Sequence, residues 1–362
     1  MRDSKSATSI VSVAKEAGVS LQTVSNVLNF PERVKPETTE RVMQAINKLN
    51  YTPNLSARRL RSKKSASIAV RVDSNASAGS SSEGLYTGYI QDEFVYEVVK
   101  AAEVRDIKVL TYTCDPDEDE VKKLKKLVDS RDVDGFLLTS TVEDDPRLKY
   151  LIQSNVPFLS FGRPWASSDE FASSYPWIDI DGASGTADAT KLFWDLGYRN
   201  IGFIGWKTFS VQPTSPRSVG DDRFLGWSRS LLELLNLKSK KISTNFFELG
   251  GESISSARDS ARKLITKFPE LDALVCASDT LAVGAQLEYR GLKKILPISG
   301  FDNSPTSKVF NFTSLDQNIP EIAAHALVVL MGESGNTVAK VNNSKKPEQA
   351  NLIFKPKLIS RI

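Results

Sequence analysis

The sequence is poor in the side chains that most often bind metals or activate nucleophiles. Its 362 residues include one histidine, His325, and two cysteines, Cys114 and Cys276. A single histidine argues against a multi-histidine metal site and against a serine–histidine–aspartate triad. Both cysteines lie in apolar, strand-like stretches far apart in the chain, which predicts buried free thiols and offers no metal-ligand spacing. We therefore expect no metal, no cofactor and no catalytic residue.

Long apolar runs and phosphate-binding glycine loops are also missing. No stretch of about 18 apolar residues occurs, so no membrane span and no membrane partner are expected. The first residues, MRDSKSATS, lack the apolar core of an export signal, which predicts a cytoplasmic protein. Neither GxxxxGKS/T nor GxGxxG occurs, which argues against a nucleotide site of those types. A hydrophobic content of 40% over this length is enough for two or three packed domains.

Positive charge is concentrated at the N-terminal end. The chain holds 47 Lys and Arg against 44 Asp and Glu, a net charge of +3. Residues 1–65 hold 12 of the basic and 5 of the acidic residues, a net charge of +7 that leaves −4 for the remainder. A basic end on a mildly acidic body predicts a polyanionic partner bound at that end. The alternative is a solvated basic tail, against which the apolar periodicity of this region argues.

Residues 9–28, SIVSVAKEAGVSLQTVSNVL, predict two short helices joined by a tight turn. Ser9 can cap the first helix, whose apolar residues fall on one face, and Gly18 can end it in a left-handed conformation. Ser20 can cap a second helix that begins at Leu21. This pattern is typical of the helix-turn-helix motif, whose second helix lies in the major groove of DNA. A packing module without DNA contacts is the alternative.

A third helix is expected from about Pro36 to Leu49, because proline suits the first helical position. Residues 55–64, LSARRLRSKK, are too few and too charged to form a stable helix alone. DNA phosphates can neutralise these cations, and Leu60 among arginines suits a wedge in the minor groove. An ordinary basic linker is the alternative.

The first 62 residues resemble the DNA-binding head and hinge of the lactose-repressor (LacI/GalR) family. The resemblance rests on SIVSVAKEAGVSLQTVSNVLN and on VKPETTERVMQAINKLNYTPNLSARRLRS. It implies that Leu21, Gln22 and Asn26 read bases in the major groove. It also implies that Leu60 enters the minor groove, with Ala57 as its small helical neighbour.

Two positions depart from the pattern of that family. Asn26 stands where arginine is common in the family. Because Arg favours guanine and Asn favours adenine, the operator is expected to differ from the commonest half-site of the family. Lys35 stands where Ser or Thr usually caps the third helix, which puts that cap in doubt. The complete set of expected DNA contacts is Ser20, Leu21, Gln22, Thr23, Ser25, Asn26, Asn54, Ala57, Arg58, Leu60 and Arg61.

From residue 66 the pattern alternates between short apolar runs and helical stretches. Strands are expected at 67–72, 108–113, 135–139, 156–161, 177–180, 200–205, 243–248, 273–276 and 296–300. Strands separated by helices predict βαβ units and parallel sheets, and the length favours two similar halves with a cleft between them. The expected fold is thus an all-α helix-turn-helix head on an α/β core, which the resemblance makes two doubly wound parallel-sheet subdomains of periplasmic-binding-protein type.

Domain boundaries follow from the same pattern. We expect a DNA-binding domain at 1–52, a hinge at 53–64, and an effector-binding and dimerisation core at 65–362. The two halves of the core are expected at about 65–162 plus 318–345, and at 163–317 plus 346–362. The resemblance implies three crossings between them, near 162–176, 293–295 and 317–320.

Ligands of open α/β sheets bind outside the carboxyl ends of the strands. The polar, glycine and aromatic residues near those ends are Asp73, Gly162, Arg163, Trp177, Arg223, Ser278, Asp302 and Gln317. Charged and amide groups can hydrogen-bond hydroxyls, and an indole can cover the C–H face of a sugar ring, so this set predicts a polyhydroxylated ligand. Each residue also has a structural alternative, such as a cap, an ion pair or a core position.

The resemblance gives several of these residues a role. Arg223, Asp302, Gln317 and Trp177 match effector contacts of the family. Gly162 stands where some members have a carboxylate, and Ser278 stands where many have Asn. The segments FGR and VGDDR are similar to those of sugar-responsive members. A purine or nucleoside effector is the alternative within the family.

The leading hypothesis is a transcriptional regulator, more specifically a repressor. It is expected to bind a palindromic double-stranded DNA operator as a homodimer. A small sugar is expected to close the cleft, disturb the hinges and release the operator. Two further classes were weighed. A solute receptor for a transporter would need an export signal. A sugar-processing enzyme would need two placed carboxylates, whereas Asp221 and Asp222 are merely adjacent.

Overall fold

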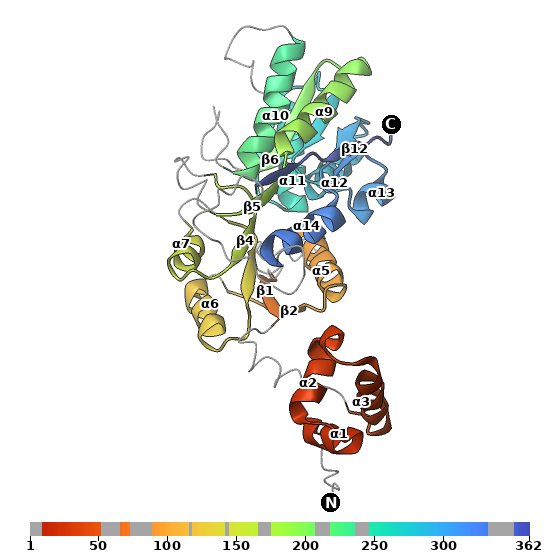
Figure 1. Ribbon diagram of the computed structural model, residues 1–362. Coiled ribbons are helices and arrows are strands. Elements are labelled where there is room, and N and C mark those ends of the chain that lie inside the picture. The colour runs from red at the N-terminus through yellow and green to blue at the C-terminus, as the bar shows by residue number, and fades with distance from the viewer. Residues whose placement is uncertain are drawn as a thin grey trace, which may run out of the picture. The chain divides into compact units, whose positions relative to one another are not determined.

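The computed structural model describes residues 9–51, 66–72, 89–115, 118–141, 145–165, 175–206, 218–235, 246–331 and 351–362 (Figure 1). The chain divides into two compact units, a head up to Lys64 and a body from Ser65 onward. Six of the expected site residues lie outside the described residues: Asn54, Ala57, Arg58, Leu60, Arg61 and Asp73.

The head is a three-helix unit built as the capping residues predict. Its elements are α1 (Ile10–Ala17), α2 (Leu21–Asn29), the 3₁₀ turn η1 (Pro31–Arg33) and α3 (Pro36–Lys48). Ser9 and Ser20 accept hydrogen bonds from backbone N–H groups in the first turns of α1 and α2. Gly18 ends α1 at φ +62°, in the left-handed region. Lys35 makes no side-chain cap, so α3 begins on Pro36 alone.

The head has its own apolar core, drawn from all three helices. This core fixes the angle between α1 and α2 and leaves the outer face of α2 to solvent. Its buried members are Val13, Ala14, Ala17, Val24, Val27, Val42, Ala45 and Ile46.

The first half of the body is a six-stranded parallel sheet in the order β11-β5-β4-β3-β1-β2. Its elements are β1 (Ser67–Arg71), α5 (Tyr89–Glu103), β2 (Lys108–Tyr112), α6 (Glu120–Asp129), β3 (Gly135–Leu138), α7 (Pro146–Gln153), β4 (Phe158–Phe161), β5 (Trp177–Ile180), α14 (Ile319–Met331) and β11 (Leu352–Phe354). Ile68 and Val70 pack with α5 and α14, whereas Ala69 packs with α6 and α7. Successive residues of β1 therefore serve opposite faces of a doubly wound sheet.

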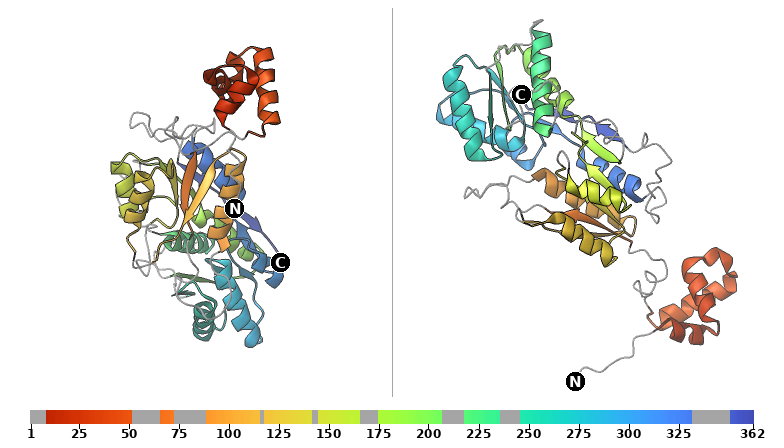
Figure 2. Two further views of the ribbon diagram at one scale, coloured as in Figure 1. Left: turned by 90° about the horizontal axis from the view of Figure 1, so that it is seen from below. Right: turned by 90° about the vertical axis from the view of Figure 1, so that its left-hand side faces the viewer.

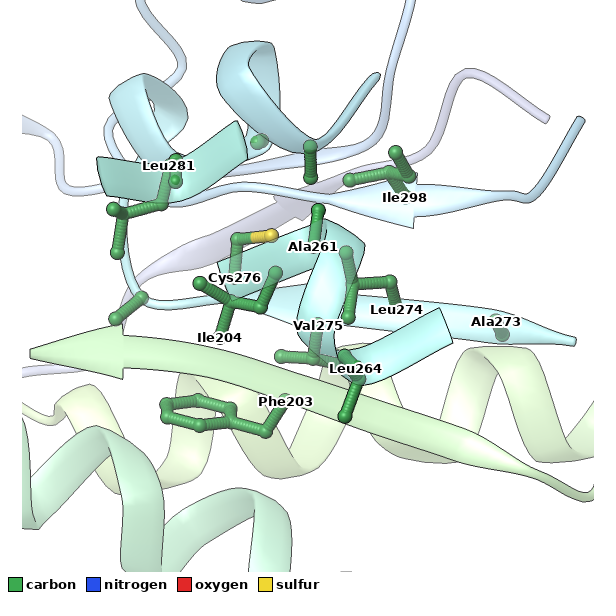
Figure 3. Packing of buried hydrophobic residues seen from close by; sticks show 14 of the residues in the cluster. Phe203, Ile204, Ala261, Leu264, Ala273, Leu274, Val275, Cys276, Leu281 and Ile298 are labelled. Carbon is green, nitrogen blue, oxygen red and sulfur yellow. The ribbon is translucent and has the colours of Figure 1, made fainter. Parts of the chain in front are cut away.

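The second half is a four-stranded parallel sheet in the order β7-β6-β8-β9. Its elements are α9 (Gly182–Asp195), β6 (Ile201–Trp206), α10 (Val219–Leu234), β7 (Phe247–Gly250), α11 (Ile254–Lys267), β8 (Ala273–Cys276), α12 (Asp279–Gly291), β9 (Ile298–Ser299) and α13 (Pro305–Phe310). Phe203 and Ile204 project to opposite sides of β6 (Figure 3). Phe203 meets the aromatic rings of Phe224 and Trp227 on α10. Figure 2 shows the two sheets of the body, with their helices, from two further sides.

The crossings between the halves differ from the expected ones. The residues of β5 and β11 were expected in the second half, but both strands are hydrogen-bonded into the six-stranded sheet. The first crossing therefore lies near Asp181, between β5 and α9. The expected crossing at 293–295 lies within the second half, between α12 and β9. The chain returns at 317–318 into α14 and crosses again after β11, because β12 (Lys357–Ile359) pairs antiparallel with β10 (Ser314–Asp316).

The two cysteines are free, but only one is buried. Cys276 lies in the centre of β8 with no exposed surface. Cys114 was also expected to be buried, yet it is half-buried. It follows the end of β2 by two residues, where side chains reach the strand-end edge of the sheet rather than the core.

Candidate functional site

The first turn of α2 presents polar side chains on the outer face of the head. Gln22 donates from Nε2 to Oδ1 of Asn26 at 3.0 Å, so the two amides lie side by side one helical turn apart. Leu21 is 41% exposed beside them. Ser20 and Thr23 are joined through their hydroxyl oxygens at 2.8 Å, and Ser20 also caps the helix. Ser25 was expected among the DNA contacts but is only 6% exposed, because it faces inward from α2.

The body contains a cavity of about 1000 Å³ at the carboxyl ends of strands from both sheets. Gly162, Arg223, Ser278, Asp302 and Gln317, all expected ligand residues, line it. The cavity thus brings together expected ligand residues that are up to 155 positions apart, from Gly162 to Gln317.

Arg223 is the cation at the second-half end of this cavity. It stands in the first turns of α10, where its guanidinium carbon lies 3.7 Å from the ring centroid of Phe301 and 5.2 Å from that of Trp206. One Nη donates to the carbonyl of Ala277, and Nε has no protein partner among the described residues. Burial lowers the pKa of Arg223, and the carboxyls of Asp302 and Glu252 oppose that change. The side chain is thus fixed by stacking with donor capacity left over for a ligand.

Asp302 and Gln317 form a polar pair opposite the arginine. Gln317 donates from Nε2 to Oδ1 of Asp302 at 2.6 Å. The backbone of Asp302 has φ +119°, and its N–H donates to the carbonyl of Leu315 at 2.8 Å. Burial raises the pKa of Asp302 well above its ordinary value, and the Arg223 guanidinium opposes the rise. A polyhydroxylated ligand would find donors and acceptors together here.

Glu252 belongs to the same end of the cavity and was missed by the sequence analysis. It accepts a hydrogen bond from the indole N–H of Trp206, and its two oxygens lie 2.8 and 3.0 Å from the Ser278 hydroxyl. Burial raises its pKa. Glu252 follows β7 by two residues, so the strand-end rule could have found it. The strand was placed at 243–248, whereas it ends at Gly250, and this error hid the residue.

Arg163 lies behind the cavity rather than among its lining residues. It donates from Nε to Asp179 at 2.6 Å and from Nη2 to Asp222 at 3.2 Å. Its guanidinium also stacks 4.8 Å from the ring centroid of Trp165, which does line the cavity. Since Asp179 is in β5 and Asp222 is in α10, the ion pairs of Arg163 tie the two halves together.

Trp177 was expected at the ligand and does not line the cavity. Its ring packs at the edge of the core beneath α6 and α7, next to the buried Tyr175. The indole begins β5, at the amino end of the strand, whereas the cavity lies at the carboxyl ends. The direction of β5 therefore places Trp177 at the end of the strand opposite the cavity.

The first-half end of the cavity holds a second charged cluster that sequence reasoning did not identify. Glu120, at the start of α6, accepts from Arg71 at 2.6 Å, from Arg147 at 3.2 Å and from the Tyr112 hydroxyl at 2.8 Å. Arg147 is paired in turn with Asp145 at 2.6 Å. These groups come from β1, β2, α6 and the start of α7, so no single sequence motif indicates the cluster.

Asp279 is held by the protein itself. Its carboxylate accepts from the Ser304 N–H at 2.7 Å and from the hydroxyls of Ser304 and Ser314, each at 2.6 Å. In the described part of the chain, no group of three or more His, Cys, Asp or Glu side chains is placed to hold a metal ion. Nor does any helix within the described ranges have the length and apolarity needed to cross a bilayer.

Two family models match the chain. One, described as bacterial regulatory proteins, lacI family, matches residues 9–54. The other, described as periplasmic binding proteins and sugar binding domain of LacI family, matches residues 87–324.

Individual proteins match along almost the whole length. The chain is 26% identical to the HTH-type transcriptional regulator RegA of Clostridium saccharobutylicum, over 98% of both chains. A solved complex of the transcriptional regulator CelR with cellobiose matches with a TM-score of 0.66 and 24% identity, over 98% of this chain and 99% of that one. The Lac repressor dimer bound to operator and the anti-inducer ONPF matches with a TM-score of 0.69 and 21% identity, over 98% of both. At these identities the two structures show a shared fold.

Proposed function

Because the chain belongs to the LacI family of bacterial regulatory proteins, we propose that it is a transcriptional repressor. In this proposal it binds a palindromic DNA operator as a homodimer, and a small carbohydrate in the body cavity controls its operator affinity. The observation that carries the proposal is that one chain joins a helix-turn-helix head with an exposed amide pair to a body with a cavity lined by hydrogen-bond donors and acceptors. We infer a cytoplasmic location as part of this proposal, because the partner would be DNA.

Base reading is assigned to the outer face of α2. Gln22 and Asn26 are amides, and an amide can both donate to and accept from the major-groove edge of adenine. Their mutual hydrogen bond fixes the rotamers of both side chains before DNA arrives, which reduces the entropy lost on binding. The helix N-terminus beside them favours a nearby phosphate.

Carbohydrate binding is assigned to the second-half end of the cavity. Arg223 supplies donors, Asp302 and Glu252 supply acceptors, and Gln317 supplies both. Such a mixture satisfies vicinal hydroxyls, and Trp206 adds an apolar ring surface beside it. The match to the sugar binding domain of the LacI family and the CelR–cellobiose complex favour the same ligand class. We infer a binding role without catalysis.

Dimerisation is assigned to the face of the body formed by α5 and α13. Tyr96 and Val99 on α5 and Val309 on α13 are exposed apolar residues. The two helices are close enough for their charges to interact: burial raises the pKa of Glu93 on α5, and the Lys308 ammonium on α13 opposes the rise. A two-fold dimer through this face would present two heads to an inverted repeat, like the solved Lac repressor dimer on its operator.

The switch requires that the ligand bind one arrangement of the two halves more tightly than another. The cavity is lined by both halves, so a ligand that contacts both changes the free energy of their relative rotation. The Arg163–Asp222 ion pair joins the same halves and opposes that rotation. We propose that this rotation is passed to the hinges and weakens operator binding.

Base preference tests the DNA-reading part of the proposal. An operator is first selected from a library of inverted repeats with the purified full chain. Asn26→Arg should then exchange adenine for guanine at one position of each half-site, with a discrimination of about 1–3 kcal/mol. Asn47→Arg, at an exposed position of α3, is the matched control. It adds the same charge to the head and should raise affinity for all sequences alike. Selection of identical bases by both variants and the wild type would refute the assignment.

A further inference from the structure

The cavity is larger and more acidic than a site for a single sugar ring or a charged sugar requires. Its volume of about 1000 Å³ lies at the upper end of the roughly 300–1000 Å³ typical of small-molecule pockets. We propose that the effector is an uncharged oligosaccharide of two or more rings, with one ring beside Trp206 and the next against Trp165. This inference rests on the proposed function and specifies the ligand of the same site.

The polar groups beside Trp206 account for one ring only. Arg223, Asp302, Gln317 and Glu252 all lie at the second-half end of the cavity. The cavity continues past them to Cys114 and Glu118, between β2 and α6, and to Glu120 at the start of α6. A ligand confined to the second-half end would leave the first-half residues from Cys114 to Glu120 uncontacted and would favour one arrangement of the halves less strongly. A ligand that reaches both ends therefore needs more than one ring.

Charge excludes anionic sugars. Among the described residues that line the cavity, two are basic, Arg71 and Arg223. The acidic lining residues are Asp115, Glu118, Glu120, Asp179, Asp222, Glu252, Asp279 and Asp302. A phosphate or carboxylate on the ligand would lose its hydration in this lining and would face more acidic groups than cations, although burial raises the pKa of Asp222, Glu252, Asp279 and Asp302.

Both arginines in this lining already contact protein groups. Arg71 is paired with Glu120 at 2.6 Å, and Arg147 contacts the same carboxylate. Arg223 is held against Phe301 and by the Ala277 carbonyl, and the nearby carboxyls of Asp302 and Glu252 act on its charge. Its Nε has no protein partner among the described residues and can donate to a neutral hydroxyl of the ligand.

Trp165 has the properties of a ligand platform. It lines the cavity, yet it belongs to none of the hydrophobic clusters found among the described residues. The Arg163 guanidinium stacks on it at 4.8 Å, and Arg163 is anchored by Asp179 and Asp222. An indole that is held in place by an anchored cation, with no role in a core, is available to the C–H face of a second ring.

A ladder of paired sugars tests the inference on the full chain. Calorimetric affinities are measured for glucose with cellobiose and maltose, galactose with lactose, and xylose with xylobiose, and for glucose 6-phosphate and glucuronate. At least one disaccharide should bind about tenfold tighter than its own monosaccharide, and the anionic sugars should not bind. Trp165→Ala should remove the advantage of the disaccharide and leave monosaccharide affinity unchanged, and Trp165→Phe should keep most of it. Trp194, on α9, stacks with Arg199 in a similar way but is not among the cavity-lining residues. Trp194→Ala should therefore change neither affinity.

The outcomes separate this inference from the proposed function. Equal affinity for a monosaccharide and its disaccharides, tighter binding of an anionic sugar, or an unchanged disaccharide advantage in Trp165→Ala would each overturn the inference while leaving a sugar-controlled repressor. Binding of the operator without binding of any sugar in the panel would overturn the carbohydrate effector itself.

Discussion

At the scale of single residues, Asp279 is a buried carboxyl whose hydrogen-bond partners come from the protein itself. Its carboxylate joins the start of α12 to Ser304, which caps α13, and to Ser314 of β10. Burial raises its pKa from the ordinary 3.8 to about 6, although three hydrogen bonds to the carboxylate oppose the rise. Desolvation is therefore the larger effect.

This raised pKa predicts a pH dependence of stability. Between pH 3.8 and about 6 the folded chain binds a proton at Asp279 that the unfolded chain has released. The stability contributed by this group is therefore complete below about pH 4 and is lost as the pH rises to about 6. Asp279→Asn should gain roughly 3 kcal/mol in unfolding free energy relative to the wild type across that range, measured by urea unfolding. Asp195→Asn, at an exposed position on α9, controls for the loss of one charge. A constant difference between Asp279→Asn and wild type from pH 4 to pH 7 would show that the group is not perturbed.

The ligand residues that the sequence predicted share one feature, which is a place just after a buried strand or at a helix start. Arg223, Asp302 and Gln317 have such places, and all line the cavity. The prediction for Trp177 was wrong because this residue begins its strand, at the end opposite the cavity. The Glu120 cluster was not predictable, since its members are brought together by the stacking of β1, β2, α6 and α7 and not by any spacing along the chain.

At the scale of elements, the head depends on the turn between α1 and α2. The left-handed Gly18 directs its N–H back to the carbonyl of Lys15 at 3.3 Å, and the N–H of Val19 reaches Ala14 at 3.0 Å. This closure ends α1 and places Ser20 to begin α2. The exposed direction of Gln22 and Asn26 follows from it.

Replacement of that glycine isolates the cost of backbone strain. A Cβ at Gly18 would meet nothing within 4 Å, so Gly18→Ala adds no clash and should destabilise the head by about 1 kcal/mol through its φ alone. Gly291→Ala is the matched control, because its Cβ also has open space and its φ is not positive. That variant should be neutral or slightly stabilised. Helical circular dichroism during urea unfolding measures both, and equal stability of the two variants would refute the strain argument.

The elements themselves were largely predictable because their signals are local. Caps at Ser9 and Ser20, and buried strands such as β5 and β8, lie as expected. α13 and β10 to β12 were not expected, because six residues span fewer than two helical turns and strands of three residues are shorter than the apolar runs of four or more that indicate a buried strand. Their location depends on the partner strand, as in the antiparallel pairing of Leu315 with Leu358.

At the scale of the whole molecule, sequence order and sheet membership diverge. β11 is separated from its neighbour β5 by more than 170 residues, yet it extends the same sheet, with Leu352 beside Ile178. No local pattern encodes such a pairing, which explains why the halves were divided at the wrong strands. The consequence is functional, since the connections beside Asp181, Gln317 and Lys355 are the places where one half can turn against the other.

The central claim is that occupation of this cavity changes how tightly the head holds DNA. The most direct measurement is the fluorescence anisotropy of the selected inverted repeat, titrated with the full chain in the presence and absence of the sugar that calorimetry identifies. We predict two chains per duplex and a weakening by the sugar of about 5- to 150-fold. Arg223→Met should bind the same duplex with unchanged affinity and show no response. An operator affinity that stays the same while the sugar saturates the wild-type cavity would contradict the account.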